Sequence, residues 1–154
     1  LERFNERYLM PFSDKNINHG FSMMTVSCLM VEVLESFRQS WENSNSRSAL
    51  AFCYFISRSD HFSELSGKHQ EIYKNIRCGL LHQGETTGGW TITTTKSEFV
   101  DFERKIINAQ IFMERLALEM KSYIQELKSS EWNSELWQNT NAKIKYICKQ
   151  FNES

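Results

Sequence analysis

The sequence predicts an all-α protein, a bundle of about five or six helices that forms a single domain over residues 1–154. Only one proline and six glycines occur, so long stretches contain no residue that breaks a helix. Apolar residues make up 40% of the chain and aromatic residues 13%, which is enough for a core and too much for a disordered chain. Apolar residues also recur at alternating steps of four and three from Phe102 to Leu127, which is typical of a helix buried along one face.

The first half of the chain contains three predicted helices. A short helix is expected over residues 2–10, before the only proline. The stretch 20–42 is apolar on all sides apart from Glu32 and Glu35, which predicts a helix in the middle of the bundle. A third helix is expected over residues 48–57, and the polar stretch before it is expected only to end the second helix.

The second half contains three more predicted helices and one extended segment. A fourth helix is expected over residues 68–82, with an apolar stripe at every fourth position. The glycines and β-branched residues of 84–96 predict a small β-hairpin or an extended excursion. The apolar spacing then predicts one long helix over about 97–129, and a last helix is expected over 133–151.

Charge, cysteine content and hydropathy limit the partners and cofactors that we expect for this chain. The formal net charge is −1, so an RNA site would need a local positive cleft. The four cysteines are widely spaced and pair with no histidine at zinc-site spacing, which predicts reduced thiols in a cytoplasmic protein without a metal or other cofactor. The most apolar run, residues 21–34, is too short to span a bilayer, so no membrane partner is expected.

Arg77 and His82 lie five positions apart, where the fourth helix is expected to end. Histidine suits proton transfer near neutral pH, and the planar arginine fork stays charged and holds two phosphoryl oxygens. The two suit metal-independent RNA cleavage, in which a ribose 2′-hydroxyl attacks the adjacent phosphate and the 5′-oxygen leaves. Five residues of regular helix separate side chains by about 140°. The pair therefore meets only if the helix loosens or ends between them, or if two chains each give a pair to one cleft, and we expect the helix to end within one turn of His82.

The stretch "YKNIRCGLLHQGETTGGW", in an all-α chain of this size, resembles the HEPN superfamily (higher eukaryotes and prokaryotes nucleotide-binding domain). The specific part of the resemblance is the R-x4-H motif of Arg77 and His82 near the end of a helix. The resemblance implies a helical bundle and a metal-independent endoribonuclease of a bacterial defence or toxin–antitoxin system. It also implies a homodimer in which the motifs of two chains meet. By this resemblance, Arg77 steadies the phosphate and His82 is the acid–base group.

Two hypotheses other than an endoribonuclease stay open. Many active members of the superfamily have a polar residue there, and this chain has Cys78. One alternative is therefore a catalytically inactive HEPN-like module that binds a nucleotide or a protein partner. The other is a structural helical domain in which Arg77 is a satisfied core arginine.

Two glutamates on the most apolar helix are candidates to support the motif. A charge in such a helix is costly unless it is paired. We therefore expect Glu32 or Glu35 to orient Arg77 or His82, as a carboxylate behind a reacting group would. The alternative is that both glutamates lie at the edge of the helix and meet solvent.

Four residues around the motif are candidates for substrate binding. Lys74 makes the fourth helix locally basic and suits a phosphate backbone, although such a lysine more often belongs to a solvated face. Tyr73 and Trp90 suit base stacking, although such rings more often belong to a core or a dimer contact. Gln83 suits a substrate contact or the exit from the helix.

Overall fold

The computed structural model describes residues 9–12, 19–95 and 97–152 of the chain. Over these residues the chain is mostly helical and carries a small three-stranded sheet, in agreement with the predicted helical class. The helix expected over residues 2–10 lies almost wholly outside the described residues, which start there with a short 3-10 helix, η2 (Met10–Phe12).

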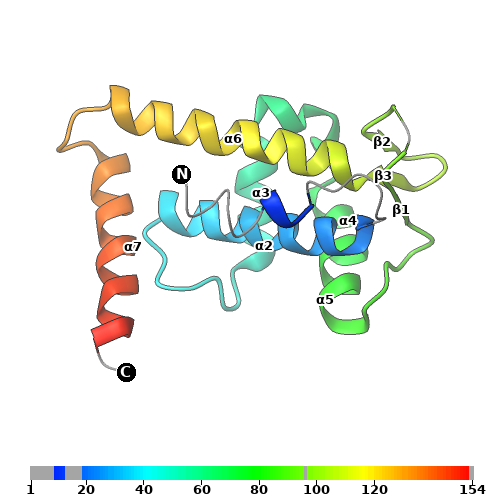
Figure 1. Cartoon of the computed structure of the whole chain (residues 1–154), viewed down its shortest axis with the longest axis horizontal. Coiled ribbons are helices and arrows are strands. Elements are labelled where there is room, and N and C mark those ends of the chain that lie inside the picture. The colour runs from blue at the N-terminus through cyan, green and yellow to red at the C-terminus, as the bar shows by residue number, and fades with distance from the viewer. Residues whose placement is uncertain (1–8, 13–18, 96, 153–154) are drawn as a thin grey trace.

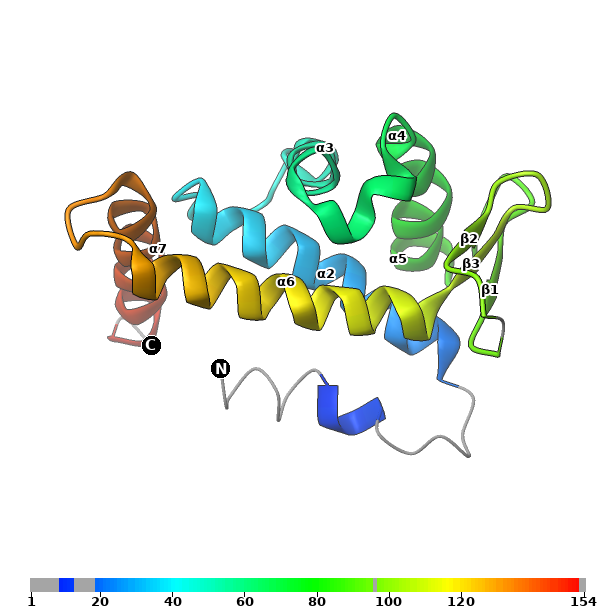
Figure 2. The same cartoon turned by 90° about the horizontal axis from the view of Figure 1, so that it is seen from above.

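Two long helices form the centre of the molecule. α2 (Gly20–Arg38) and α6 (Ala109–Ser129) run side by side (Figures 1 and 2). α3 (Ser48–Arg58) packs against α2 on one side of this pair (Figure 2). The 3-10 helix η3 (Asp60–Leu65) follows α3 and contacts α6. α7 (Glu135–Asn152) stands across the end of the pair (Figure 1). The side chains of the two central helices supply much of the core: Met24, Cys28, Met30, Val31, Phe112 and Leu116.

α2 is long and apolar enough to span a membrane by length and composition alone. However, 61% of its apolar 18-residue window is buried against the rest of the chain. This burial agrees with the helix in the middle of the bundle that the apolar pattern predicted.

The fourth helix is continuous but not uniform. It consists of α4 (His69–Ile72), a wide π-helical turn η4 (Tyr73–Cys78) and α5 (Gly79–Gln83). It ends at Gly84, which caps the helix in the left-handed conformation with φ of 70°. The prediction that the helix ends within one turn of His82 is therefore confirmed.

The prediction of one long helix over 97–129 is wrong in its first twelve residues. α6 begins only at Ala109, because the side chain of Asn108 accepts hydrogen bonds from the N–H groups of Gln110 (3.0 Å) and Ile111 (3.1 Å). Asparagine is among the best residues at this capping position, so it fixes the start of the helix.

The residues before α6 belong to the sheet. β3 (Ile106–Asn108) lies between β1 (Thr91–Thr93), to which it is parallel, and β2 (Val100–Asp101), to which it is antiparallel. The β element is therefore a mixed sheet that reaches to residue 108, rather than a hairpin within 84–96. Apolar β-branched residues such as Ile106 and Ile107 suit such a strand, although their spacing also continues the helical pattern of α6.

Candidate functional site

The guanidinium of Arg77 is held where three helices meet. Its Nε donates a hydrogen bond to Oε1 of Glu32 on α2 (2.7 Å), and its Nη2 donates to the hydroxyl of Ser48, the first residue of α3 (3.2 Å). The ring of Tyr73 lies 5.7 Å from the guanidinium carbon. The side chains of Arg77 and Glu32 are only 13% and 5% exposed. Arg77 is therefore a fixed, largely buried cation, and Glu32 is the carboxylate that orients it.

The second oxygen of Glu32 is also satisfied. Oε2 accepts hydrogen bonds from the hydroxyls of Ser44 (2.7 Å) and Ser48 (2.8 Å). A buried carboxylate is stable only with such partners, and these come from the loop between α2 and α3 and from the first residue of α3. No role was predicted for these serines, although a serine-rich stretch after a helix with two charges in an apolar setting was the available indication.

Burial and the neighbouring groups set the charge states around Arg77. Burial lowers the pKa of Arg77, but the hydrogen bond and charge of Glu32, together with Tyr73 and Cys78, raise it by more, so the guanidinium stays charged. Burial, and then a hydrogen bond with the Cys78 side chain, raise the pKa of Tyr73. Burial also raises the pKa of Cys28 strongly, so this thiol stays protonated and is no nucleophile.

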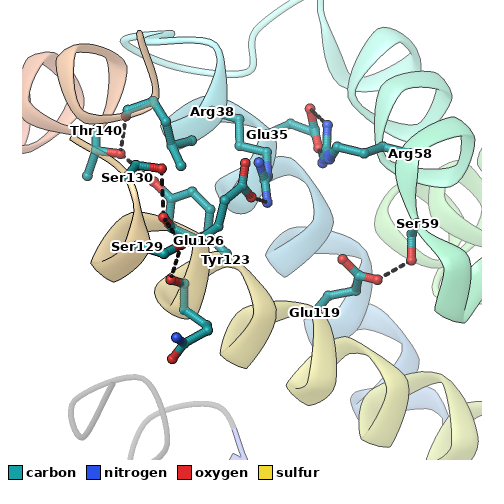
Figure 3. Close-up of polar contacts among 12 residues, drawn as sticks. Glu35, Arg38, Arg58, Ser59, Glu119, Tyr123, Glu126, Ser129, Ser130 and Thr140 are labelled. Atoms are coloured by element: carbon teal, nitrogen blue, oxygen red, sulfur yellow. Dashed lines mark hydrogen bonds and ion pairs between the residues drawn. The ribbon is translucent and has the colours of Figure 1, made fainter. Parts of the chain in front are cut away.

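Glu35 belongs to a different contact. It is fully buried and forms an ion pair with Arg58 on α3. Figure 3 shows this pair beside other polar contacts of the region, such as those of Arg38 with Glu126 on α6. Of the two glutamates predicted to orient the motif, only Glu32 reaches it.

The wide turn of the fourth helix and the loop that follows are locked together. The carbonyl of Asn75, inside the π turn, accepts a hydrogen bond from the N–H of Thr87 (2.9 Å). The Thr87 hydroxyl donates to the side-chain oxygen of Asn75 (3.1 Å). A side chain at Gly79 would meet the carbonyl oxygen of Glu85 at 2.5 Å, so only glycine allows the loop to lie this close. These contacts hold the end of the helix that carries His82.

His82 and Arg77 do not converge within one chain. The π turn includes Arg77 and ends at Cys78, and Gly79–Gln83 is regular α-helix, so the helix is widened only at the start of this interval and does not end between the two residues. Arg77 is turned toward α2 and α3, whereas His82 is exposed. Among the residues that the structure describes, no hydrogen bond or ion pair joins them. A meeting of the two groups between two chains stays a prediction, and the pairing of the largely buried Arg77 with Glu32 also fits the hypothesis of a satisfied core arginine.

The remaining candidates divide between surface and core. Lys74 and Gln83 are exposed, and Gln83 is the last residue of α5. Tyr73 is half-buried against Phe52, with ring centres 5.7 Å apart. Trp90 is buried and packs edge-to-face on Phe102, so its ring is part of the packing rather than a platform for a base.

A groove lies beside the end of α5. It has a volume of about 270 Å³ and runs between α2 and α5. Its walls are Phe21, Ser22, Thr25, Val26, Leu80 and Gly84. Phe21 is exposed, as is Leu29 two turns further along α2. The surface next to His82 is therefore partly apolar.

Comparisons of the chain with protein-family models, with curated proteins and with solved structures give no match.

Proposed function

We propose that the chain is a HEPN-like, metal-independent endoribonuclease that acts as a homodimer in the cytoplasm, within a bacterial defence or toxin–antitoxin system. One observation carries the proposal: a single helix holds a fixed guanidinium, that of Arg77, and exposes an imidazole, that of His82, just before it ends. This is the pair of groups that RNA cleavage without a metal needs.

The reaction assigns one task to each group. Arg77 stabilises the charge that develops on the phosphate as the ribose 2′-hydroxyl attacks. His82 moves the proton between the 2′-hydroxyl and the departing 5′-oxygen. The products are a 2′,3′-cyclic phosphate and a free 5′-hydroxyl. Glu32, Ser48 and the Cys78 side chain engage Arg77, and a guanidinium has five N–H donors, so it retains donors for a phosphoryl oxygen.

Purified protein incubated with unstructured RNA tests the proposal. We expect cleavage that continues in excess chelator and leaves 2′,3′-cyclic phosphate and 5′-hydroxyl ends, as end-specific labelling and mass spectrometry of the fragments measure. Absence of cleavage on every unstructured RNA, or cleavage that stops with chelator, would contradict the proposal.

The second copy is part of the proposal, because one chain does not bring Arg77 and His82 together. The exposed apolar side chains of α2 at and beyond the α5 groove support this face as the contact between the two copies. Leu29 is exposed two turns beyond Phe21 on α2, and we propose that it belongs to this contact.

Replacement of Leu29 by glutamate is expected to convert a dimer into a monomer and to abolish cleavage, because the charge would be buried at the contact. Light scattering at micromolar concentration and the cleavage assay measure the two effects. Leu118→Glu is the matched control, since Leu118 is equally exposed but lies on α6. A wild-type protein that is monomeric yet active would count against the two-chain site.

A second candidate function is a non-catalytic module that binds a nucleotide or a protein partner. The observation that favours it is the degree to which Arg77 is already satisfied by Glu32 and Ser48, together with Cys78 at the next position. Calorimetry with nucleotides and pull-down of a second polypeptide distinguish it. This function would show binding that depends on Arg77 and no turnover of RNA.

A further inference from the structure

The loop between α2 and α3 carries a cluster of aromatic and cationic groups. The guanidinium carbon of Arg47 lies 5.4 Å from the centre of the Trp41 ring. The ring centres of Trp41 and of Tyr54, which is on α3, are 6.3 Å apart. Arg47 is exposed, Tyr54 is 40% exposed and Trp41 is half-buried. Among the described residues, no carboxylate forms an ion pair with Arg47. We refer to Trp41, Arg47 and Tyr54 as the stacking cluster.

Two hollows, each of about 280 Å³, lie beside the stacking cluster. One hollow is bounded by Trp41 and Arg47 and otherwise by polar loop residues: Ser40, Glu42, Asn43, Asn45 and Ser46. The other is bounded by Gln39, Tyr54, Ser57 and Arg58. Each hollow therefore combines a flat ring with hydrogen-bonding groups, as a site for an unpaired base does. Arg58 in the second hollow is paired with Glu35, so Arg47 in the first is the guanidinium that suits a phosphate, although Glu42 also lines that hollow.

The loop is also joined directly to Arg77. Ser44, in the same loop, and Ser48, directly after it, both donate hydrogen bonds to Glu32. Ser48 also accepts a hydrogen bond from Arg77. Two residues of the loop, Ser40 and Ser46, have positive φ (52° and 58°), so the loop has a defined conformation that ordinary side chains rarely adopt.

We propose that the stacking cluster binds single-stranded RNA and guides it toward Arg77; this inference rests on the proposed function. Bases stack on Trp41 and Tyr54, and Arg47 contacts the phosphate between them. Stacking of this kind accepts any base, so binding depends little on sequence.

Trp, Tyr and Arg are also the residues that dominate contacts between proteins. Two features favour RNA here. The hollow beside Trp41 has mostly polar walls, whereas the centre of a protein contact is apolar. Trp41 and Arg47 also lie in the loop whose Ser44 donates a hydrogen bond to Glu32, the carboxylate partner of Arg77, so the loop links the stacking cluster to the site of Arg77.

Binding of a fluorescein-labelled oligouridylate of about ten nucleotides tests the inference. The binding protein is the His82→Ala variant, so that the RNA is not consumed. In this background, Trp41→Ala and Tyr54→Ala are each expected to raise Kd by about 5- to 150-fold, the loss of one stacked base. Trp132→Ala, which removes an exposed tryptophan of the α6–α7 loop, is expected to leave Kd unchanged.

The salt dependence tests the role of Arg47. Arg47→Gln is expected to make the plot of log binding constant against log salt less steep by about 0.7, the value for one phosphate contact on a single strand. Arg104→Gln, which changes an exposed arginine beside the sheet, is expected to leave the slope unchanged.

The inference is overturned if folded Tyr54→Ala protein binds RNA as tightly as its parent. If Trp41→Ala fails to fold, the Kd of Tyr54→Ala alone decides the test. It is also overturned if the variants lose self-association but keep RNA binding, because the cluster is then a protein contact. If Tyr54→Ala, with His82 intact, cleaves RNA with an unchanged KM, the proposed role of the stacking cluster is wrong but the endoribonuclease proposal stands. If RNA binds at the stacking cluster but the wild-type protein never cleaves it, the endoribonuclease proposal is wrong but the proposed RNA-binding site stands.

Discussion

RNA cleavage by the His82→Ala variant is expected to be about 10²- to 10⁴-fold slower than by the wild-type protein, the usual contribution of a general acid or base. The free energy of unfolding is expected to change by no more than about 0.5 kcal/mol, since His82 is exposed and makes no hydrogen bond or ion pair among the described residues. Single-turnover rates in excess chelator and urea unfolding curves measure the two quantities.

His69→Ala is the matched control for this experiment. His69 is at the first position of the same helical stretch, more than three turns from His82. Its removal is expected to leave the cleavage rate unchanged. A His82→Ala protein that cuts RNA at the wild-type rate would contradict the proposed role, and would point to a contaminating nuclease if the rate varied between preparations.

The end of the fourth helix was predictable from the sequence because its determinants are local. Gly84 adopts the left-handed conformation that ends a helix, and a glycine at this point is the usual sequence indication of a helix end. The start of α6 was not predictable from apolar spacing, since Phe102 and Ile106 continue the pattern of that helix. Asn108 and the pairing of Thr91 with Ile106, fifteen positions away, decide the outcome, and the pairing is invisible to any local pattern.

The site shows the same division between local and distant determinants. A buried charge requires a partner, so a contact of Arg77 with a glutamate of α2 was a reasonable hypothesis. Which glutamate makes it depends on a rotation of about 300° between Glu32 and Glu35, and thus on how α2 packs on α3. The stacking cluster depends on the conformation of a loop, which includes two serines with positive φ, and the sequence gives no indication of that conformation.

Replacement of Glu32 by alanine is expected to lower the free energy of unfolding by about 3–5 kcal/mol, because it leaves the guanidinium of Arg77 largely buried without its carboxylate. Arg77→Met is expected to cost a similar amount, since Glu32 then keeps only the two serine hydroxyls. The double variant Glu32→Leu with Arg77→Met is expected to recover most of the loss, because apolar side chains of similar size need no partner. Urea unfolding curves with a constant slope measure all three values.

The ion pair of Arg115 with Glu64 provides the control for this cycle. It has good geometry, with one contact of 2.6 Å, but the two side chains are 25% and 47% exposed. Glu64→Ala is therefore expected to cost about 1 kcal/mol or less. If Glu32→Ala cost no more than this, the guanidinium of Arg77 would be free to leave its position and its orientation would not come from Glu32. If the cycle shows the expected coupling, Arg77 is fixed before RNA arrives, and a phosphate meets a guanidinium that needs no reorganisation to stabilise the transition state.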